Sequence, residues 1–129
     1  MTDDGHVVRV RFYGIDAPEV ANEHWPTQPY GRVAARFVSN LLLKHAVKVR
    51  LTGETTYQRE VGEVFVDEHS ASQTIVEQGL AWWNSRFAPT DEALKTLEHA
   101  ARTKRIGLWR QRHPIPPWQY RGRHQRREN

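Results

Sequence analysis

The chain has 129 residues and contains no cysteine, which excludes a disulfide framework and any metal site built on thiolates. It also lacks a run of about 18 consecutive apolar residues, so no membrane-spanning helix is predicted. Residues 1–4 have neither the basic nor the apolar region of a signal peptide. We expect a secreted or periplasmic location if a signal peptide has been removed, and a cytoplasmic one otherwise.

Several catalytic motifs are missing as well. The seven histidines show no metal-ligand spacing, and neither a Gly-rich phosphate loop nor a Gly-x-Ser-x-Gly nucleophile elbow is present. These absences argue against a zinc peptidase, a nucleotide triphosphatase of the P-loop type and a serine hydrolase.

Positive charge is concentrated at one end of the chain. Residues 102–129 hold nine Lys/Arg and one acid, whereas residues 1–101 carry a net charge of −4. A basic segment of this kind attracts nucleic acid or another polyanion, although a merely solvated tail has the same composition.

The periodicity of apolar residues predicts one domain with three strands and three helices. Strands are expected at 7–13, 46–51 and 61–66, and helices at 30–44, 70–78 and 91–107. Residues 52–56 indicate a turn, and the proline-rich segment 114–118 is expected to be extended. Grouped strands with helices at the margins favour an α+β fold around a small barrel or sheet.

Four side chains near the first and third strands could perform phosphate chemistry. Arg11 lies on the polar side of the first strand, and Asp16 and Glu19 follow it in a turn fixed by Pro18. Arg59 precedes the third strand. Paired acids in a loop are most often plain surface charge, but two arginines suit a phosphate because each presents a planar fork of donors. Carboxylate oxygens also suit a hard cation such as Ca²⁺.

These residues resemble a known signature. Residues 11–19 (RFYGIDAPE) are similar to the signature of the staphylococcal nuclease-like, or thermonuclease, family. Residues 28–31 (QPYG), 57–59 (YQR), 76–81 (VEQGLA) and 105–109 (RIGLW) fit it too, and residues 116–121 (PPWQYR) resemble a common bacterial C-terminal extension. The resemblance covers about residues 5–121, in order and at the family's spacing.

The resemblance implies an α+β, mainly β, fold: a five-stranded OB-type barrel with three helices over residues 1–121, followed by a basic flexible tail at 122–129. It implies a Ca²⁺-dependent nuclease that hydrolyses phosphodiester bonds of DNA and RNA and leaves 3′-phosphates.

The resemblance also implies roles for single residues. Asp16 would be a Ca²⁺ ligand through its carboxylate and Ala17 through its backbone carbonyl. Glu19 would position or deprotonate the attacking water. Arg11 and Arg59 would bind the phosphate and offset charge in the transition state, and Tyr57 would contact a phosphate.

The family's first strand and its Asp-Gly-Asp-Thr turn, which carries a second metal aspartate, would fall before Met1. We therefore expect a gap that is either an artefact of the start site or filled by another chain, in a homodimer formed by strand exchange or at an exposed barrel edge. Loss of one carboxylate predicts weak Ca²⁺ binding. The alternative function is a non-catalytic, nuclease-like module that binds nucleic acid or protein.

Overall fold

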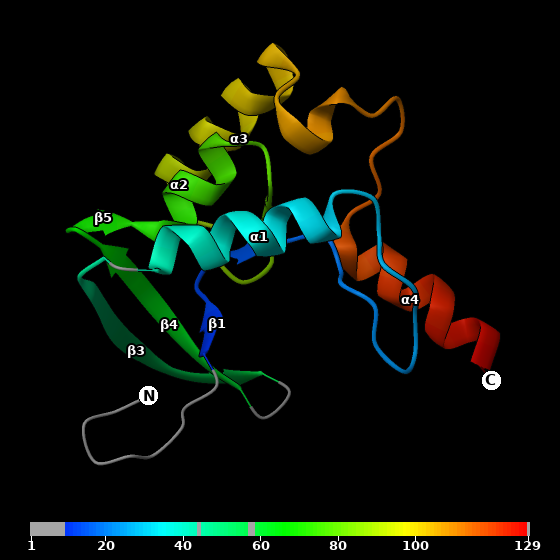
Figure 1. Ribbon diagram of the computed structural model, residues 1–129, viewed down its shortest axis with the longest axis horizontal. Coiled ribbons are helices and arrows are strands. Elements are labelled where there is room, and N and C mark those ends of the chain that lie inside the picture. The colour runs from blue at the N-terminus through cyan, green and yellow to red at the C-terminus, as the bar shows by residue number, and fades with distance from the viewer. Residues whose placement is uncertain (1–9, 44, 57–58, 129) are drawn as a thin grey trace.

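The computed structural model describes residues 10–43, 45–56 and 59–128, with side chains described up to residue 124 and not at residue 56 (Figure 1). Strands and helices are mixed, as the predicted α+β class requires. In chain order the elements are β1 (Val10–Phe12), β2 (Ile15–Asp16), α1 (Gly31–Leu42), β3 (Val47–Thr56), β4 (Arg59–Val66), β5 (His69–Ser70), α2 (Ala71–Glu77), β6 (Trp82–Trp83), α3 (Glu92–Lys104), the 3₁₀ helix η1 (Gly107–Arg110) and α4 (Pro117–Glu128).

The main sheet has the strand order β1-β4-β3, with β5 paired to β4. Strand β1 runs parallel to β4, whereas β3 is antiparallel to it. Strands β2 and β6 form a separate antiparallel pair. Within the described residues the sheet is open, and β1 and β3 are its edge strands. The predicted missing strand would belong at these edges; residues 1–9, which precede β1, lie outside the described part of the chain.

Strand β3 has an exposed apolar face. Val47, Val49 and Leu51 alternate along it, and each is more than two-fifths exposed. An edge strand with such a face is a ready site for pairing with another strand. The predicted homodimer stays a prediction, and this strand is where it can be tested.

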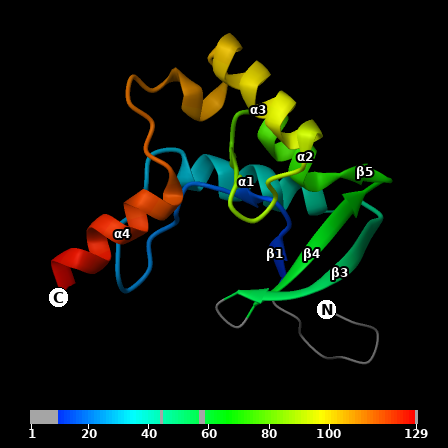
Figure 2. The ribbon, with the colours of Figure 1, turned by 180° about the vertical axis from the view of Figure 1, so that it is seen from behind.

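The core lies where α2 and α3 meet the sheet. Ile75 and Val76 of α2, Leu94 of α3 and Val64 of β4 belong to one buried cluster. Helix α4 lies apart from this core, beside the loop that connects β2 to α1 (Figures 1 and 2). Among the described helices, none has the length and apolarity needed to cross a bilayer.

Local signals in the sequence explain several element boundaries. The Ser70 side chain accepts a hydrogen bond from the Gln73 N–H and so begins α2, and Asp91 caps α3 in the same way through the Leu94 N–H. Gly62 is tightly enclosed, because a Cβ there would lie 2.8 Å from Val10. The predicted helices agree with α1, α2 and α3 to within a few residues.

The predicted turn at residues 52–56 is wrong. These residues continue β3, and the register with β4 shifts between Leu51 and Thr55. The shift marks a bulge that contains Gly53, whose φ of +89° is one that glycine tolerates without strain. A bulge and a turn favour the same small and polar residues, so the composition misled the prediction.

The predicted extended conformation of residues 114–118 is also wrong from Pro117 onward. Pro117 is the first residue of α4, a position where its missing N–H costs no helical hydrogen bond. The N–H groups of Gln119 and Tyr120 both donate to the Pro116 carbonyl. Helix α4 continues across the predicted domain boundary at residue 121, and the flexibility of residues 122–129 stays a prediction.

Candidate active site

Glu19 is held in place by a network within its own loop. Its N–H donates to the side-chain oxygen of Gln28 over 3.0 Å, and its carbonyl accepts from the Gln28 N–H over 2.9 Å. The Gln28 amide nitrogen in turn donates to the Ile115 carbonyl over 2.6 Å. Helix α1 begins at Gly31 directly against this loop, and a Cβ at Gly31 would lie only 2.2 Å from the Glu19 carbonyl oxygen. The backbone of Glu19 is therefore fixed.

Arg11 is buried, although the alternation of apolar and polar residues places it on the polar side of β1. Its guanidinium pairs with the Asp16 carboxylate over 2.9 Å, and both side chains are only 9% exposed. The amide of Asn84 donates to the same Asp16 oxygen over 2.8 Å. The Phe87 ring lies 5.5 Å from the Arg11 guanidinium, within cation–π range. These partners satisfy the buried charge, and a strand pattern cannot reveal them because Asn84 and Phe87 lie about 70 residues away in the sequence.

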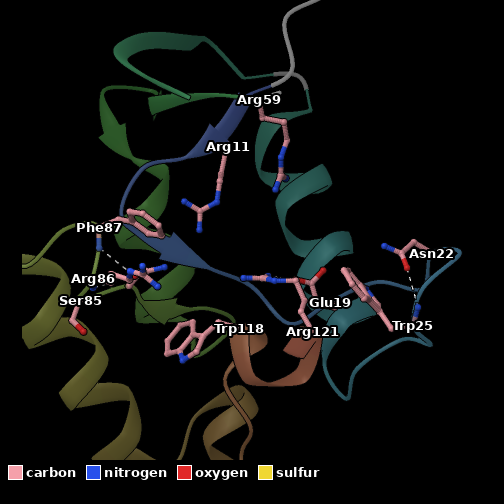
Figure 3. Close-up of a pocket in the computed structure, with 11 residues that line it drawn as sticks. Arg11, Glu19, Asn22, Trp25, Arg59, Ser85, Arg86, Phe87, Trp118 and Arg121 are labelled. Atoms are coloured by element: carbon pink, nitrogen blue, oxygen red, sulfur yellow. Dashed lines mark hydrogen bonds and ion pairs between the residues drawn. The ribbon is translucent and has the colours of Figure 1, made fainter. Parts of the chain in front are cut away.

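Arg59 joins Arg11 on one face of the sheet. Arg11 is in register with Val61 of the parallel strand β4, and Arg59 lies two residues before Val61. Residues two apart on a strand share a face, so the two arginines point the same way. In Figure 3 both side chains reach into one cavity.

That cavity has a volume of about 590 Å³ and combines arginines, aromatic rings and polar groups. Phe87 and Trp118, which follow the predicted site residues in the sequence, are 48% and 39% exposed. The lining residues are Arg11, Glu19, Asn22, Trp25, Arg59, Asn84, Ser85, Arg86, Phe87, Trp118 and Arg121. Four guanidinium groups face one lining carboxylate, so the cavity carries an excess of positive charge.

Helix α4 contributes two of these residues, which the sequence analysis missed. Trp118 packs with its ring against Trp82, at 5.8 Å between centroids. The Arg121 guanidinium pairs with the Glu19 carboxylate and lies 3.7 Å from Asp16. The sequence of residues 116–121 resembles a C-terminal extension, but the extended conformation predicted for residues 114–118 does not indicate where their side chains point.

The helix is anchored next to the site. The Tyr120 hydroxyl donates to the Pro26 carbonyl over 2.7 Å. Burial and, to a smaller extent, the charge of Glu19 raise the pKa of that hydroxyl above its usual 10.0, so it keeps its proton and remains a donor. Arg121 is thus presented to Glu19 by a helix that is fixed to the same loop.

The predicted metal ligands lie together but are few. Asp16 ends β2 and is buried, and Ala17 follows it directly. Among the described residues, no group of three or more acidic, histidine or cysteine side chains is arranged to hold a metal ion. Asp16 and Glu19 are hard oxygen donors, and Arg121 contacts both, so the two carboxylates face one cationic position.

Of the six predicted site residues, the structure brings Arg11, Asp16, Glu19 and Arg59 to one place. Tyr57 lies outside the described residues. The guanidinium groups can bind a phosphate diester, and the Glu19 carboxylate can act as a proton acceptor beside it. The exposed aromatic rings can stack with nucleobases.

Comparison with known proteins agrees with the family resemblance seen in the sequence. A family model described as "Staphylococcal nuclease homologue" matches residues 9–111. The chain is 34% identical over 122 residues to an "Uncharacterized endonuclease" of Escherichia coli O157:H7, a match that covers 94% of this chain and 75% of that protein. It is 32% identical over 113 residues to "Staphylococcal-like nuclease CAN1" of Arabidopsis thaliana, covering 88% and 33%. It is 28% identical over 112 residues to "Thermonuclease" of Staphylococcus intermedius, covering 82% and 66%.

Proposed function

Because this chain belongs to the family of staphylococcal nuclease homologues, we propose that it is a nuclease that hydrolyses phosphodiester bonds of DNA and RNA in the cavity around Glu19. The order of its strands and helices fits the OB-type fold of that family. The observation that carries the proposal is the convergence of Arg11, Glu19 and Arg59 on one cavity with exposed aromatic rings.

The substrate class follows from the charge and the rings of the cavity. Four arginines favour a polyanion, and their planar forks match the paired oxygens of a phosphate. Phe87 and Trp118 offer flat apolar surfaces on which bases can stack, a contact that tolerates any base sequence. DNA and RNA both satisfy these requirements.

The residues have distinct tasks in this mechanism. Arg11 and Arg59 bind the scissile phosphate and offset the charge that grows on its oxygens in the transition state. Glu19 accepts a proton from the water that attacks phosphorus in line with the 5′-oxygen. The bond from phosphorus to the 5′-oxygen breaks, that oxygen takes a proton from solvent, and the phosphate remains on the 3′ side. The ion pair with Arg11 and the hydrogen bond from Asn84 fix the orientation of Asp16.

The oxygen atoms available at this site are of the kind that bind a divalent cation. The Asp16 carboxylate, the Ala17 carbonyl and the Glu19 carboxylate would hold it, and oxygen ligands of this kind are those that Ca²⁺ prefers. When bound, Ca²⁺ would polarise the phosphoryl oxygen and the attacking water. The small number of carboxylates leads us to expect weaker binding than at a site with more of them.

A second candidate function is a non-catalytic module that binds nucleic acid. It is favoured by the partners of the two carboxylates, since Asp16 and Glu19 are both paired with arginines. Such a module would use the same cavity and the same arginines without cutting the strand.

Cleavage assays with site variants separate the two functions. We expect the purified chain to cleave DNA and RNA in Ca²⁺, and both Glu19→Gln and Arg59→Ala to lower the rate at least about a hundredfold, as loss of a general base or a charge-stabilising group does. Arg36→Gln, an exposed change on α1 away from the cavity lining, is the matched control and should retain the rate. Unchanged cleavage in Glu19→Gln would contradict the assignment.

A further inference from the structure

Helix α4 extends the site beyond the part of the chain that the family model covers. The match ends at residue 111, and α4 begins at Pro117. The helix is nevertheless attached to the site, because Pro117 is almost fully buried and the Tyr120 hydroxyl donates to the Pro26 carbonyl. Just before the helix, the Ile115 carbonyl accepts from the Gln28 amide that fixes Glu19. Helix α4 and the loop between β2 and α1, which carries Glu19, therefore hold each other in place.

One side chain of α4 reaches both site carboxylates. The Arg121 guanidinium pairs with Glu19, and its nitrogen lies 3.7 Å from an Asp16 oxygen. The other Asp16 oxygen is taken by Arg11 and Asn84. Figure 3 shows the Arg121 side chain next to Glu19. Arg121 is only one-quarter exposed, so water screens these contacts incompletely. Its charge therefore lies on the side of the carboxylates that Arg11 leaves open.

The Arg121 guanidinium and a divalent cation would repel each other if both contacted the Asp16 and Glu19 carboxylates at the same time. A divalent cation bound to Asp16 and Glu19 would face the Arg121 guanidinium at close range. We propose that Arg121 is a positioning residue of this site: it holds Asp16 and Glu19 together in the free protein, and a divalent cation must displace it to bind them. The inference rests on the proposed function, because it assigns the cation to the same two carboxylates.

Calcium binding by the 129-residue chain, measured by isothermal titration calorimetry, tests this competition directly. We expect Arg121→Gln to bind Ca²⁺ at least about fivefold more tightly than the unchanged chain, the lower end of typical coupling between sites. Arg123→Gln removes the same charge from an exposed position on the same helix and is the matched control. Its affinity for Ca²⁺ should stay within about twofold of the unchanged chain. Equal affinities in the two variants, or weaker binding in Arg121→Gln, would overturn the proposal.

A second variant covers the case in which Arg121→Gln does not fold. Arg121→Lys keeps the charge but loses the planar fork that reaches two carboxylates, so we expect a smaller gain in Ca²⁺ affinity, in the same direction. Weaker binding in this variant would overturn the proposal. Cleavage by the unchanged chain is scored separately. If that chain cuts DNA in Ca²⁺ while Arg121→Gln shows no gain in affinity, the competition is refuted and the nuclease function stands. If the gain appears without any cleavage, the competition stands and the nuclease function fails.

Discussion

Replacing Gly31 by alanine should damage the site through the backbone alone. The new Cβ would lie 2.2 Å from the Glu19 carbonyl oxygen and 3.0 Å from its carbonyl carbon. To reach even 3.0 Å, the oxygen must retreat by about 0.8 Å, and no rotamer change can relieve a clash with backbone. The hydrogen bond from the Gln28 N–H to that oxygen, now 2.9 Å, would be disturbed at the same time.

The expected effects are large enough to measure separately. Overpacking of this kind costs about 1–3 kcal/mol of the free energy of unfolding, which urea denaturation can detect. A displacement of about 1 Å in a catalytic group can lower the rate by about a hundredfold, so kcat of Gly31→Ala on DNA should fall by that order. Gly122→Ala is the matched control, because a Cβ at Gly122 meets nothing within 4 Å and alanine favours the helix by up to about 1 kcal/mol. Unchanged stability and kcat in Gly31→Ala would show that the contact between Gly31 and the Glu19 carbonyl does not position Glu19.

Three further outcomes are expected. Asn84→Ala removes a buried donor to Asp16 and should cost about 1–3 kcal/mol in urea denaturation; a loss no larger than in an exposed variant would contradict the role of that bond. Trp118→Ala should raise KM for single-stranded DNA roughly fivefold or more, as loss of one stacking surface does, with kcat less affected; an unchanged KM would exclude the ring from the binding surface. Burial raises the pKa of Glu98 above its usual 4.5, so the folded state holds this proton more tightly than the unfolded chain, and the contribution of Glu98 to stability falls as pH rises above 4.5. Glu98→Gln should therefore gain in Tm relative to wild type between pH 4 and pH 8, and a pH-independent difference would rule this out.

Much of the fold could be predicted because its signals are local. The apolar spacing of α1, the cap at Ser70 and the cap at Asp91 each depend on a few neighbouring residues. The turn predicted at residues 52–56 and the extended conformation predicted from Pro117 onward are wrong because local composition there is ambiguous. Gly53 suits a bulge as well as a turn, and a proline suits the first position of a helix as well as an extended segment.

The site could be predicted in part. Arg11, Asp16 and Glu19 lie within nine residues of each other, so their proximity is visible in the sequence. Their pairing is not: the order in which Arg11, Asn84 and Arg121 surround the carboxylates depends on strands and helices that meet only in the folded chain. The burial of Arg11 has the same origin, since its partners come from β2 and from the loop after β6.

Helix α4 shows why long-range contacts limit sequence reasoning. Arg121 lies 102 residues from Glu19, and its basic surroundings predict only a general attraction to polyanions. What directs this one arginine to the site is the docking of Tyr120 and Pro117. No periodicity within residues 112–129 contains that information.

Whether this protein is a Ca²⁺-dependent nuclease can be decided by incubating the purified chain with a single-stranded DNA oligonucleotide, once in Ca²⁺ and once in an excess of chelator. We expect cleavage in Ca²⁺, none in chelator, and product fragments that carry 3′-phosphates. An oligonucleotide that stays intact in Ca²⁺ although the folded protein binds it would contradict the proposed nuclease activity and support the non-catalytic module.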